Sequence, residues 1–321
     1  MAEYLIQEET LTGIADAIRA KTGGTEAIAV GSMAEEITNL PSGDDGSFKG
    51  VIERTATNVT LPGDLTKIGD YAFYKCGDLT IDSLPDGIIS IGLYAFDECK
   101  NLALTSLPVG ITTIGSNAFY GCTNLALTSL PDGITTISNS VFYDCTNLAL
   151  TSLPVGITTI SNYAFRNCSK LALTSLPVGI TTIGGYAFYG CSKLALTSLP
   201  VGITTISSNA FYGCANLALT SLPDGITNIG EHAFDGCTKL MLTHLPSGIS
   251  TIYDYAFYGC SRLSELTFEG TPTRIGTYAF SACTNLLTIN VPWAEGAVSG
   301  APWGATKATI NYNYVAEEAT E

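Results

Sequence analysis

Residues 118–140 read AFYGCTNLALTSLPDGITTISNS, and variants of this 23-residue unit recur ten times along the 321-residue chain. A cysteine marks each copy and returns at the same interval without an insertion. The ten cysteines stand at Cys76, Cys99, Cys122, Cys145, Cys168, Cys191, Cys214, Cys237, Cys260 and Cys283. A fixed period between about 20 and 50 residues predicts a repeat solenoid, in which similar coils stack along one axis.

Each part of the unit predicts a local structure. The segment Leu125-x-Leu127 has the period-two spacing of a short strand with one buried face. The segment Ala118-Phe119-x-x-Cys122 has the spacing of a short helical turn. Residues 131–133, Pro-Asp-Gly, are typical of a chain reversal. A single coil buries too little apolar surface to offset the conformational entropy lost on folding, so we expect the coils to fold only as a stacked array.

The composition excludes several classes of function. Acidic residues outnumber basic ones by 29 to 14, which gives a net charge of −15. Nucleic-acid binding and polybasic membrane anchors both need clustered Lys and Arg, so we expect no nucleic-acid partner and no membrane insertion. No run approaches the roughly 18 apolar residues of a membrane span. The acidic N-terminus MAEYLIQEETLTG does not resemble a secretory signal, which predicts cytoplasmic synthesis without a signal peptide.

No motif predicts catalysis or a cofactor. The chain contains no C-x-x-C pair for zinc, and thiols in register on parallel coils are poorly placed for disulfides. We therefore interpret the cysteines as buried core residues. His232 and His244 are the only histidines, and Asp235 lies three residues after the first, so we expect a surface ion pair there. No glycine-rich phosphate loop is present. The sequence thus predicts no enzyme, no metal site and no cofactor.

Tyrosines gather at two positions of the unit, five and two residues before each cysteine. They are Tyr71, Tyr74, Tyr94, Tyr120, Tyr143, Tyr163, Tyr186, Tyr189, Tyr212, Tyr255, Tyr258 and Tyr278, twelve of the sixteen tyrosines in the chain. Asp97, Arg166 and Asp235 share these positions and favour water, so the stripe should be partly exposed. Tyrosine offers amphipathic contact area at low entropic cost, which favours a binding surface. Alternatively, the rings only cover the coil edges.

A second stripe consists of threonines. It comprises Thr105, Thr128, Thr151, Thr174, Thr197, Thr220 and Thr243. Threonine suits an exposed strand face, and rows of hydroxyl groups can contact glycans. A purely structural role is the alternative here as well.

The pattern A-F-x-x-C-x-x-L, followed by Pro, Gly and Ile-x-x-Ile, resembles the BspA-like 23-residue leucine-rich repeats. The resemblance covers residues 54–290. It implies a curved, right-handed leucine-rich-repeat solenoid of ten coils, with parallel β-strands and short helical turns. It also implies binding or adhesion rather than catalysis.

Both ends depart from the repeat. Residues 1–41 have the spacing of two short helices and predict a small helical attachment module, which residues 42–53 join to the repeats as a flexible linker. Residues 291–321 predict a C-terminal cap, with Trp293 and Trp303 covering the open end of the core. The segments LTGIADAIRAKTGGTEAIAVGSMAEEI and NVPWAEGAVSGAPWGATKATINYNY resemble parts of phage and prophage tail-associated proteins.

The sequence therefore predicts a non-enzymatic binding protein. We expect a phage or prophage tail protein, located in the virion, that presents its tyrosines to a protein or glycan receptor on a host cell. Residues 1–41 would join the tail or surface assembly and are compatible with a homo-oligomer. Two alternatives stay open: a bacterial cell-surface adhesin of the BspA-like class, and a structural spacer whose stripes bind nothing.

Overall fold

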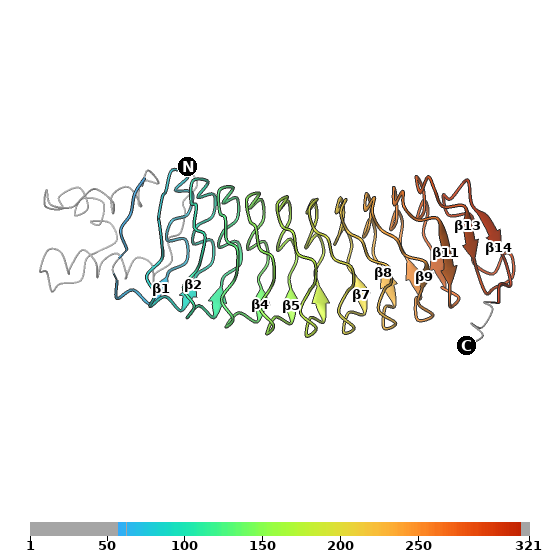
Figure 1. The fold of residues 1–321 in the computed structure, drawn as a ribbon, viewed down its shortest axis with the longest axis horizontal. Coiled ribbons are helices and arrows are strands. Elements are labelled where there is room, and N and C mark those ends of the chain that lie inside the picture. The colour runs from blue at the N-terminus through green and yellow to red at the C-terminus, as the bar shows by residue number, and fades with distance from the viewer. Residues whose placement is uncertain (1–56, 62, 316–321) are drawn as a thin grey trace, which may run out of the picture.

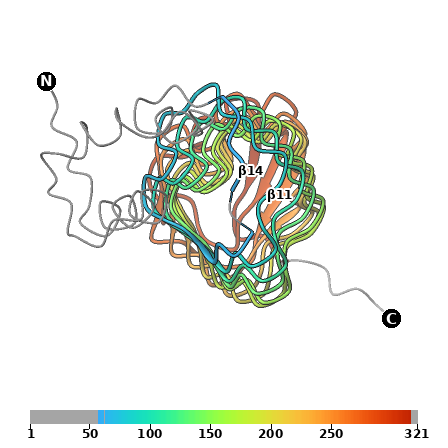
Figure 2. The same cartoon turned by 90° about the vertical axis from the view of Figure 1, so that its left-hand side faces the viewer.

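The computed structural model describes residues 57–61 and 63–315, which form a rod of stacked coils (Figure 1). Seen along the rod, successive coils superimpose on one another (Figure 2). The expected helical module at 1–41, the expected linker at 42–53 and residues 316–321 of the expected cap lie outside the described residues. In the described ranges, no helix is long and apolar enough to cross a membrane.

A ladder of two-residue parallel strands runs along the rod. Its strands are β1 (Lys67–Ile68), β2 (Ser90–Ile91), β3 (Thr113–Ile114), β4 (Thr136–Ile137), β5 (Thr159–Ile160), β6 (Thr182–Ile183), β7 (Thr205–Ile206), β8 (Asn228–Ile229), β10 (Thr251–Ile252) and β12 (Arg274–Ile275). Partners are one repeat apart, as in Thr136 opposite Thr159. They form successive sheets ordered β1-β2-β3, β4-β5-β6 and β7-β8-β10-β12. The predicted parallel leucine-rich-repeat solenoid is therefore confirmed.

The strand lies elsewhere in the coil than the leucine spacing predicted. In the central coils, the Leu125-x-Leu127 segment forms one bond to each neighbouring coil. Ala126 N–H donates to the Leu104 carbonyl at 3.0 Å, and the Leu127 carbonyl accepts from Ala149 N–H at 3.1 Å. Strands occupy this side only near the C-terminus, as β9 (His244–Leu245), β11 (Glu265–Phe268), β13 (Thr288–Asn290) and β14 (Thr309–Asn311). The central coils carry Leu-Ala-Leu-Thr-Ser-Leu here, whereas β11 reads Glu-Leu-Thr-Phe, and alanine favours strands less than threonine or phenylalanine does.

The expected helical turn is replaced by a chain of tight turns, and the described ranges contain no helix. In the coil of Cys191, Tyr186 and Gly190 adopt left-handed backbone conformations, with φ of 57° and 72°. The same two positions, five and one residues before the cysteine, are left-handed in every coil from Tyr71 to Ala282. Two left-handed residues that stand four positions apart in each coil prevent the regular i to i+4 hydrogen bonding of an α-helix.

These left-handed residues turn alternate N–H groups toward the next coil. Tyr186 N–H bonds the Ser208 carbonyl at 3.1 Å, Phe188 N–H bonds the Ala210 carbonyl at 2.8 Å, and Gly190 N–H bonds the Tyr212 carbonyl at 2.7 Å. The N–H groups between them close local turns, such as Cys191 N–H to the Phe188 carbonyl at 3.1 Å. A second inter-coil ladder therefore runs along the side of the rod that carries the tyrosines.

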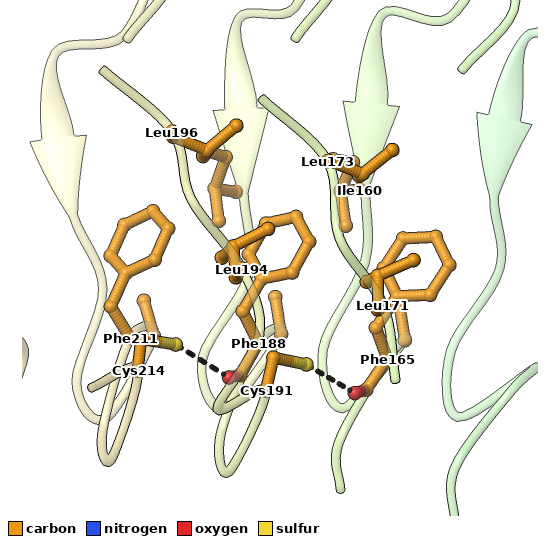
Figure 3. Packing of buried hydrophobic residues seen from close by; sticks show 14 of the residues in the cluster. Ile160, Phe165, Leu171, Leu173, Phe188, Cys191, Leu194, Leu196, Phe211 and Cys214 are labelled. Carbon is orange, nitrogen blue, oxygen red and sulfur yellow. Dashed lines mark hydrogen bonds between the residues drawn. The ribbon is translucent and has the colours of Figure 1, made fainter. Parts of the chain in front are cut away.

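The core is a set of side-chain columns, one residue from each coil (Figure 3). Phenylalanine rings stack without interruption from Phe73 to Phe280, with neighbouring centroids 5.2–5.8 Å apart. Leucine and isoleucine columns fill the space between this stack and the strands. Near the C-terminus, Trp293 and Trp303 pack around Phe268, with ring centroids 5.2 and 6.4 Å from it. Both tryptophans are buried, and the role of residues 291–321 as a cap stays a prediction.

All ten cysteines lie within the described residues and are buried, as the sequence predicted, and none forms a disulfide. From Cys99 onward, each Sγ–H donates to the phenylalanine carbonyl of the preceding coil at 2.9–3.1 Å. Figure 3 shows two of these bonds, from Cys191 to Phe165 and from Cys214 to Phe188. Burial raises the pKa of the eight thiols from Cys122 to Cys283, to about 12 for Cys283 and well above the usual value for Cys214.

We predict that 5,5′-dithiobis(2-nitrobenzoate) modifies none of the ten thiols in the native protein and all ten after denaturation. The thiolate is the reactive species, and an unpaired thiolate in this core is strongly disfavoured. The release of thionitrobenzoate, followed by absorbance, measures the reaction. A Ser175→Cys variant, whose side chain is exposed, should release one equivalent at once and serves as the control. Rapid modification of native wild-type protein would contradict a closed core.

Candidate binding surface

The sequence-predicted tyrosines form two columns beside each other. The first tyrosine column holds the residue five before each cysteine: Tyr71, Tyr94, Asn117, Ser140, Tyr163, Tyr186, Asn209, His232, Tyr255 and Tyr278. The second tyrosine column holds the residue two before it: Tyr74, Asp97, Tyr120, Tyr143, Arg166, Tyr189, Tyr212, Asp235, Tyr258 and Ser281. Ten of the twelve tyrosines are half-buried, and Tyr258 and Tyr278 are exposed, at 39% and 50%. Their binding role stays a prediction.

Within each column the rings stack along the rod. Tyr163 and Tyr186 of the first column have centroids 4.9 Å apart. Tyr189 and Tyr212 of the second column are 4.5 Å apart with ring planes 4° from parallel. Because the neighbouring coils cover the ring faces, the atoms left for a ligand are the ring edges and the hydroxyl groups. The columns therefore offer rows of phenol hydroxyls rather than flat aromatic platforms.

The first column carries tyrosine where the backbone favours other residues. Its six tyrosines have φ between 53° and 58°, a region that costs a bulky residue about 1–2 kcal/mol. Asn117 and Asn209 occupy the same position in other coils, and asparagine tolerates this conformation better. An aromatic pair contributes roughly 0.5–1.5 kcal/mol, so ring stacking offsets much of the strain. The rings thus have a structural role as well as exposed edges.

Charged side chains interrupt the second column at intervals of three coils. Arg166 lies between Tyr143 and Tyr189, with its guanidinium carbon 5.0 and 4.7 Å from their ring centroids. Asp235 contacts the first column, because its Oδ2 lies 2.7 Å from Nδ1 of His232. The predicted contact between this histidine and its neighbouring acid is therefore confirmed. The imidazole also stacks on Tyr255 at 4.8 Å, as a tyrosine ring would.

Asp97 is more buried than its charge predicted, with only 7% of its surface exposed. Burial, and then the negative charge of Glu98, raise the pKa of its carboxyl to about 7, against the opposing charge of Lys75. Burial likewise raises the pKa of Asp235, and its contact with His232 limits that rise. These pKa shifts could not be predicted from residue type, because the same position of the unit is buried in one coil and exposed in another.

The threonines form exposed rows on other faces. The predicted stripe from Thr105 to Thr243 is exposed, but most of its members lie in bends rather than on a strand. The sequence interpretation missed a second threonine array, on the strand ladder itself, where Thr135 and Thr136 are exposed between the buried Ile134 and Ile137. The repeated pair Thr-Thr between two isoleucines was its signal.

Two other kinds of site, a hollow and a metal centre, would need side-chain groups that are free to bind a ligand. A hollow of about 610 Å³ lies between the last coil and the cap, lined by Arg274, Tyr278 and Trp303 among others. Its arginine is already paired, with Nη2 2.7 Å from Oδ1 of Asp254. Over the described residues, no group of three or more His, Cys, Asp or Glu side chains could hold a metal ion. The ring Nδ1 of the exposed His244 lies 2.9 Å from the hydroxyl of Thr243.

Comparison with known proteins identifies the repeat. Residues 44–172 and 158–287 each match the family model described as BspA type Leucine rich repeat region (6 copies). No curated protein matches the chain significantly. A leucine-rich repeat protein from Bacteroides ovatus is 25% identical, with 81% of this chain and 78% of that one covered and a TM-score of 0.49. A leucine rich cell surface protein from Faecalibacterium prausnitzii is 26% identical over 75% and 80%, with a TM-score of 0.45. These scores are too low for comparing individual sites.

We predict that Asp97→Asn removes part of the pH dependence of stability. Between the carboxyl's ordinary pKa of 3.8 and its folded value of about 7, the folded protein binds the proton that the unfolded chain releases. The free energy of unfolding therefore falls as pH rises through this window. Each pKa unit corresponds to about 1.4 kcal/mol, and partial hydration reduces the net effect to about 2 kcal/mol.

Urea unfolding at pH 5 and pH 8 measures this effect. Asp97→Asn should be more stable than wild type at pH 8, and the two should be closer at pH 5. Asp132→Asn, at an exposed turn, is the control and should leave the difference between the two pH values unchanged. If wild type gains stability from pH 5 to pH 8 by the same amount as the variant, Asp97 is not protonated in the folded state.

Proposed function

The chain belongs to the BspA-type leucine-rich-repeat family, and from this premise we propose that it is a non-enzymatic binding protein for a component of a bacterial cell surface. The observation that carries the proposal is the pair of tyrosine columns, which present a row of hydroxyl groups along the rod. Tyr258 and Tyr278, the most exposed of the twelve, extend this row toward the C-terminal end. Repetition supports binding over catalysis, because an active site needs one convergent set of unlike groups.

The binding partner in this proposal is a protein or glycan on the target cell. Phenol hydroxyls donate and accept hydrogen bonds, and ring edges add apolar contact, which suits the mixed surface of a saccharide. Tyrosine pairs recur at every fourth coil of the first column, which favours a ligand that itself repeats. The pairs are Tyr71 with Tyr94, Tyr163 with Tyr186 and Tyr255 with Tyr278. The alternative is a spacer, in which the same stacked rings only stabilise the coil edges.

We further propose a phage or prophage tail as the carrier of this protein, with residues 1–41 as its attachment segment. Support comes from the tail-protein resemblance of the two terminal segments. A cell-surface adhesin is the second candidate, and membership of the BspA-type family favours it. Immunogold labelling separates the two. We expect gold on tail tips of particles released by prophage induction, whereas gold on intact producing cells would favour the adhesin.

We predict that removing four tyrosine hydroxyls abolishes most binding to target cells. The variant carries Phe at Tyr186, Tyr189, Tyr255 and Tyr258, which keeps the stacked rings and removes only the donors. Flow cytometry of fluorescently labelled protein on a panel of intact bacteria measures binding. We expect at least about a tenfold loss of apparent affinity, since a few hydrogen bonds of about 1 kcal/mol each are lost.

Tyr253→Phe with Tyr314→Phe is the matched control, because these exposed tyrosines stand outside both columns. It should stain cells as the wild type does. Equal staining by the fourfold variant would place the binding surface elsewhere. If well-folded wild type stains no strain in the panel, the spacer replaces the binding protein as the conclusion.

A further inference from the structure

The second tyrosine column has a symmetric order of side chains about one arginine. From one coil to the next it reads Asp97, Tyr120, Tyr143, Arg166, Tyr189, Tyr212 and Asp235. The repeat pattern, which is similar in all ten coils, does not require a single arginine at the middle of this order and an aspartate at each end. This order marks one place along an otherwise uniform rod.

Arg166 is held in position by aromatic rings. Besides Tyr143 and Tyr189, the rings of Tyr163 and Tyr186 in the first column lie 6.0 and 5.8 Å from its guanidinium carbon. A guanidinium stacked on aromatic faces is fixed in orientation and loses little further entropy when it binds. Its Nε is completely buried and has no hydrogen-bond partner. The two Nη groups are left as the donors at the column edge.

Among residues 57–61 and 63–315, no acidic side chain forms an ion pair with Arg166. Asp144, one residue from Tyr143, instead accepts a hydrogen bond from Asn167 Nδ2 at 2.8 Å. In a chain with a net charge of −15, this arginine among neutral rings is a local positive site.

The tyrosines on either side supply neutral hydrogen-bond donors. The rings of Tyr120 and Tyr143 stack with centroids 4.4 Å apart, and those of Tyr189 and Tyr212 with centroids 4.5 Å apart. Each phenol hydroxyl carries one proton that it can donate. Burial raises the pKa of Tyr120, and the nearby charge of Asp235 and then burial raise that of Tyr212, so both stay protonated at neutral pH.

We propose that Arg166 and the hydroxyls of Tyr143 and Tyr189 bind a single oxyanion of an acidic saccharide, a carboxylate or a phosphate. The planar guanidinium edge matches the two oxygens of such a group, and the flanking hydroxyls donate to the adjoining sugar. Asp235 limits the site toward the C-terminus, because a second anionic group near its carboxylate would be repelled. Asp97 contributes less, since it is buried and its pKa of about 7 leaves it only partly charged at neutral pH. The proposal rests on the proposed function and names the ligand class of the same surface.

The variants separate binding from folding. Arg166→Tyr places in this coil the residue that six other coils carry at the same position, so the stack is kept. Arg166→Lys keeps the positive charge but lacks the planar fork. Lys170→Gln removes one positive charge from the exposed surface of the same coil and is the control for net charge.

Isothermal titration uses three probes: cellobiuronic acid, its neutral analogue cellobiose, and glucose 6-phosphate. We expect an acidic probe to bind wild type and Lys170→Gln alike, with at least about tenfold weaker binding to Arg166→Tyr and an intermediate loss in Arg166→Lys. Cellobiose should bind much more weakly than cellobiuronic acid. The stronger of the two acidic probes identifies the oxyanion as carboxylate or phosphate.

Three results would overturn the inference: no binding of either acidic probe, equal binding of cellobiose, or unchanged binding by Arg166→Tyr. Cell staining by the same variants keeps this inference distinct from the proposed function. If Arg166→Tyr stains cells as wild type does while the fourfold Tyr→Phe variant does not, the binding surface stands and the oxyanion site falls. If neither the wild type nor the variant stains cells, but binding of the acidic probe still depends on Arg166, the oxyanion site stands and the proposed cellular role falls.

Discussion

The structure depends on the hydrogen bonds that join each coil to the next in a fixed register. On one side the bonds run between two-residue strands. On the other they run from alternate N–H groups of the turn segment, which two left-handed residues per coil direct along the rod. Because every partner lies one repeat away, an insertion in one coil would shift all its bonds. The invariant 23-residue interval is the sequence counterpart of this requirement.

The same register explains why side chains of one kind form columns. Once the backbone is in register, each phenylalanine must lie on the next, and each cysteine must lie beside the preceding phenylalanine carbonyl. The register also determines which atoms of the tyrosines are exposed on the surface. Tyrosines stacked at this spacing hide their faces and present their edges, so hydrogen bonding rather than stacking is the chemistry open to a ligand. An aromatic-rich sequence thus yields a polar surface.

Sequence reasoning predicted the solenoid, the buried cysteines and the two tyrosine columns, because these follow from the repeat period and from residue type. It placed the strand at Leu125-x-Leu127 and a helical turn at Ala118 to Cys122, and both were wrong in position or kind. The period-two spacing of apolar residues indicates which side chains face the core, but not which residues form the hydrogen-bonded strands. The residue type does not predict the left-handed backbone of the tyrosines, because tyrosine rarely adopts it. The burial of Asp97 depends on the residues packed around it, which the sequence pattern does not specify.

A perfectly regular rod can bind a repeating ligand at any offset along its length. Regularity alone therefore does not determine which coil a given part of the ligand contacts. Interruptions of the repeat supply position, because each is present at one coil and absent from its neighbours. Arg166 differs in charge from both adjacent coils, and Asp97 and Asp235 differ in sign from Arg166 at equal distances on either side. Since the core columns continue unbroken beneath all three, the interruptions cost the fold little. A substitution at one of these positions can therefore change the charge that the surface presents at one coil without changing the core beneath it.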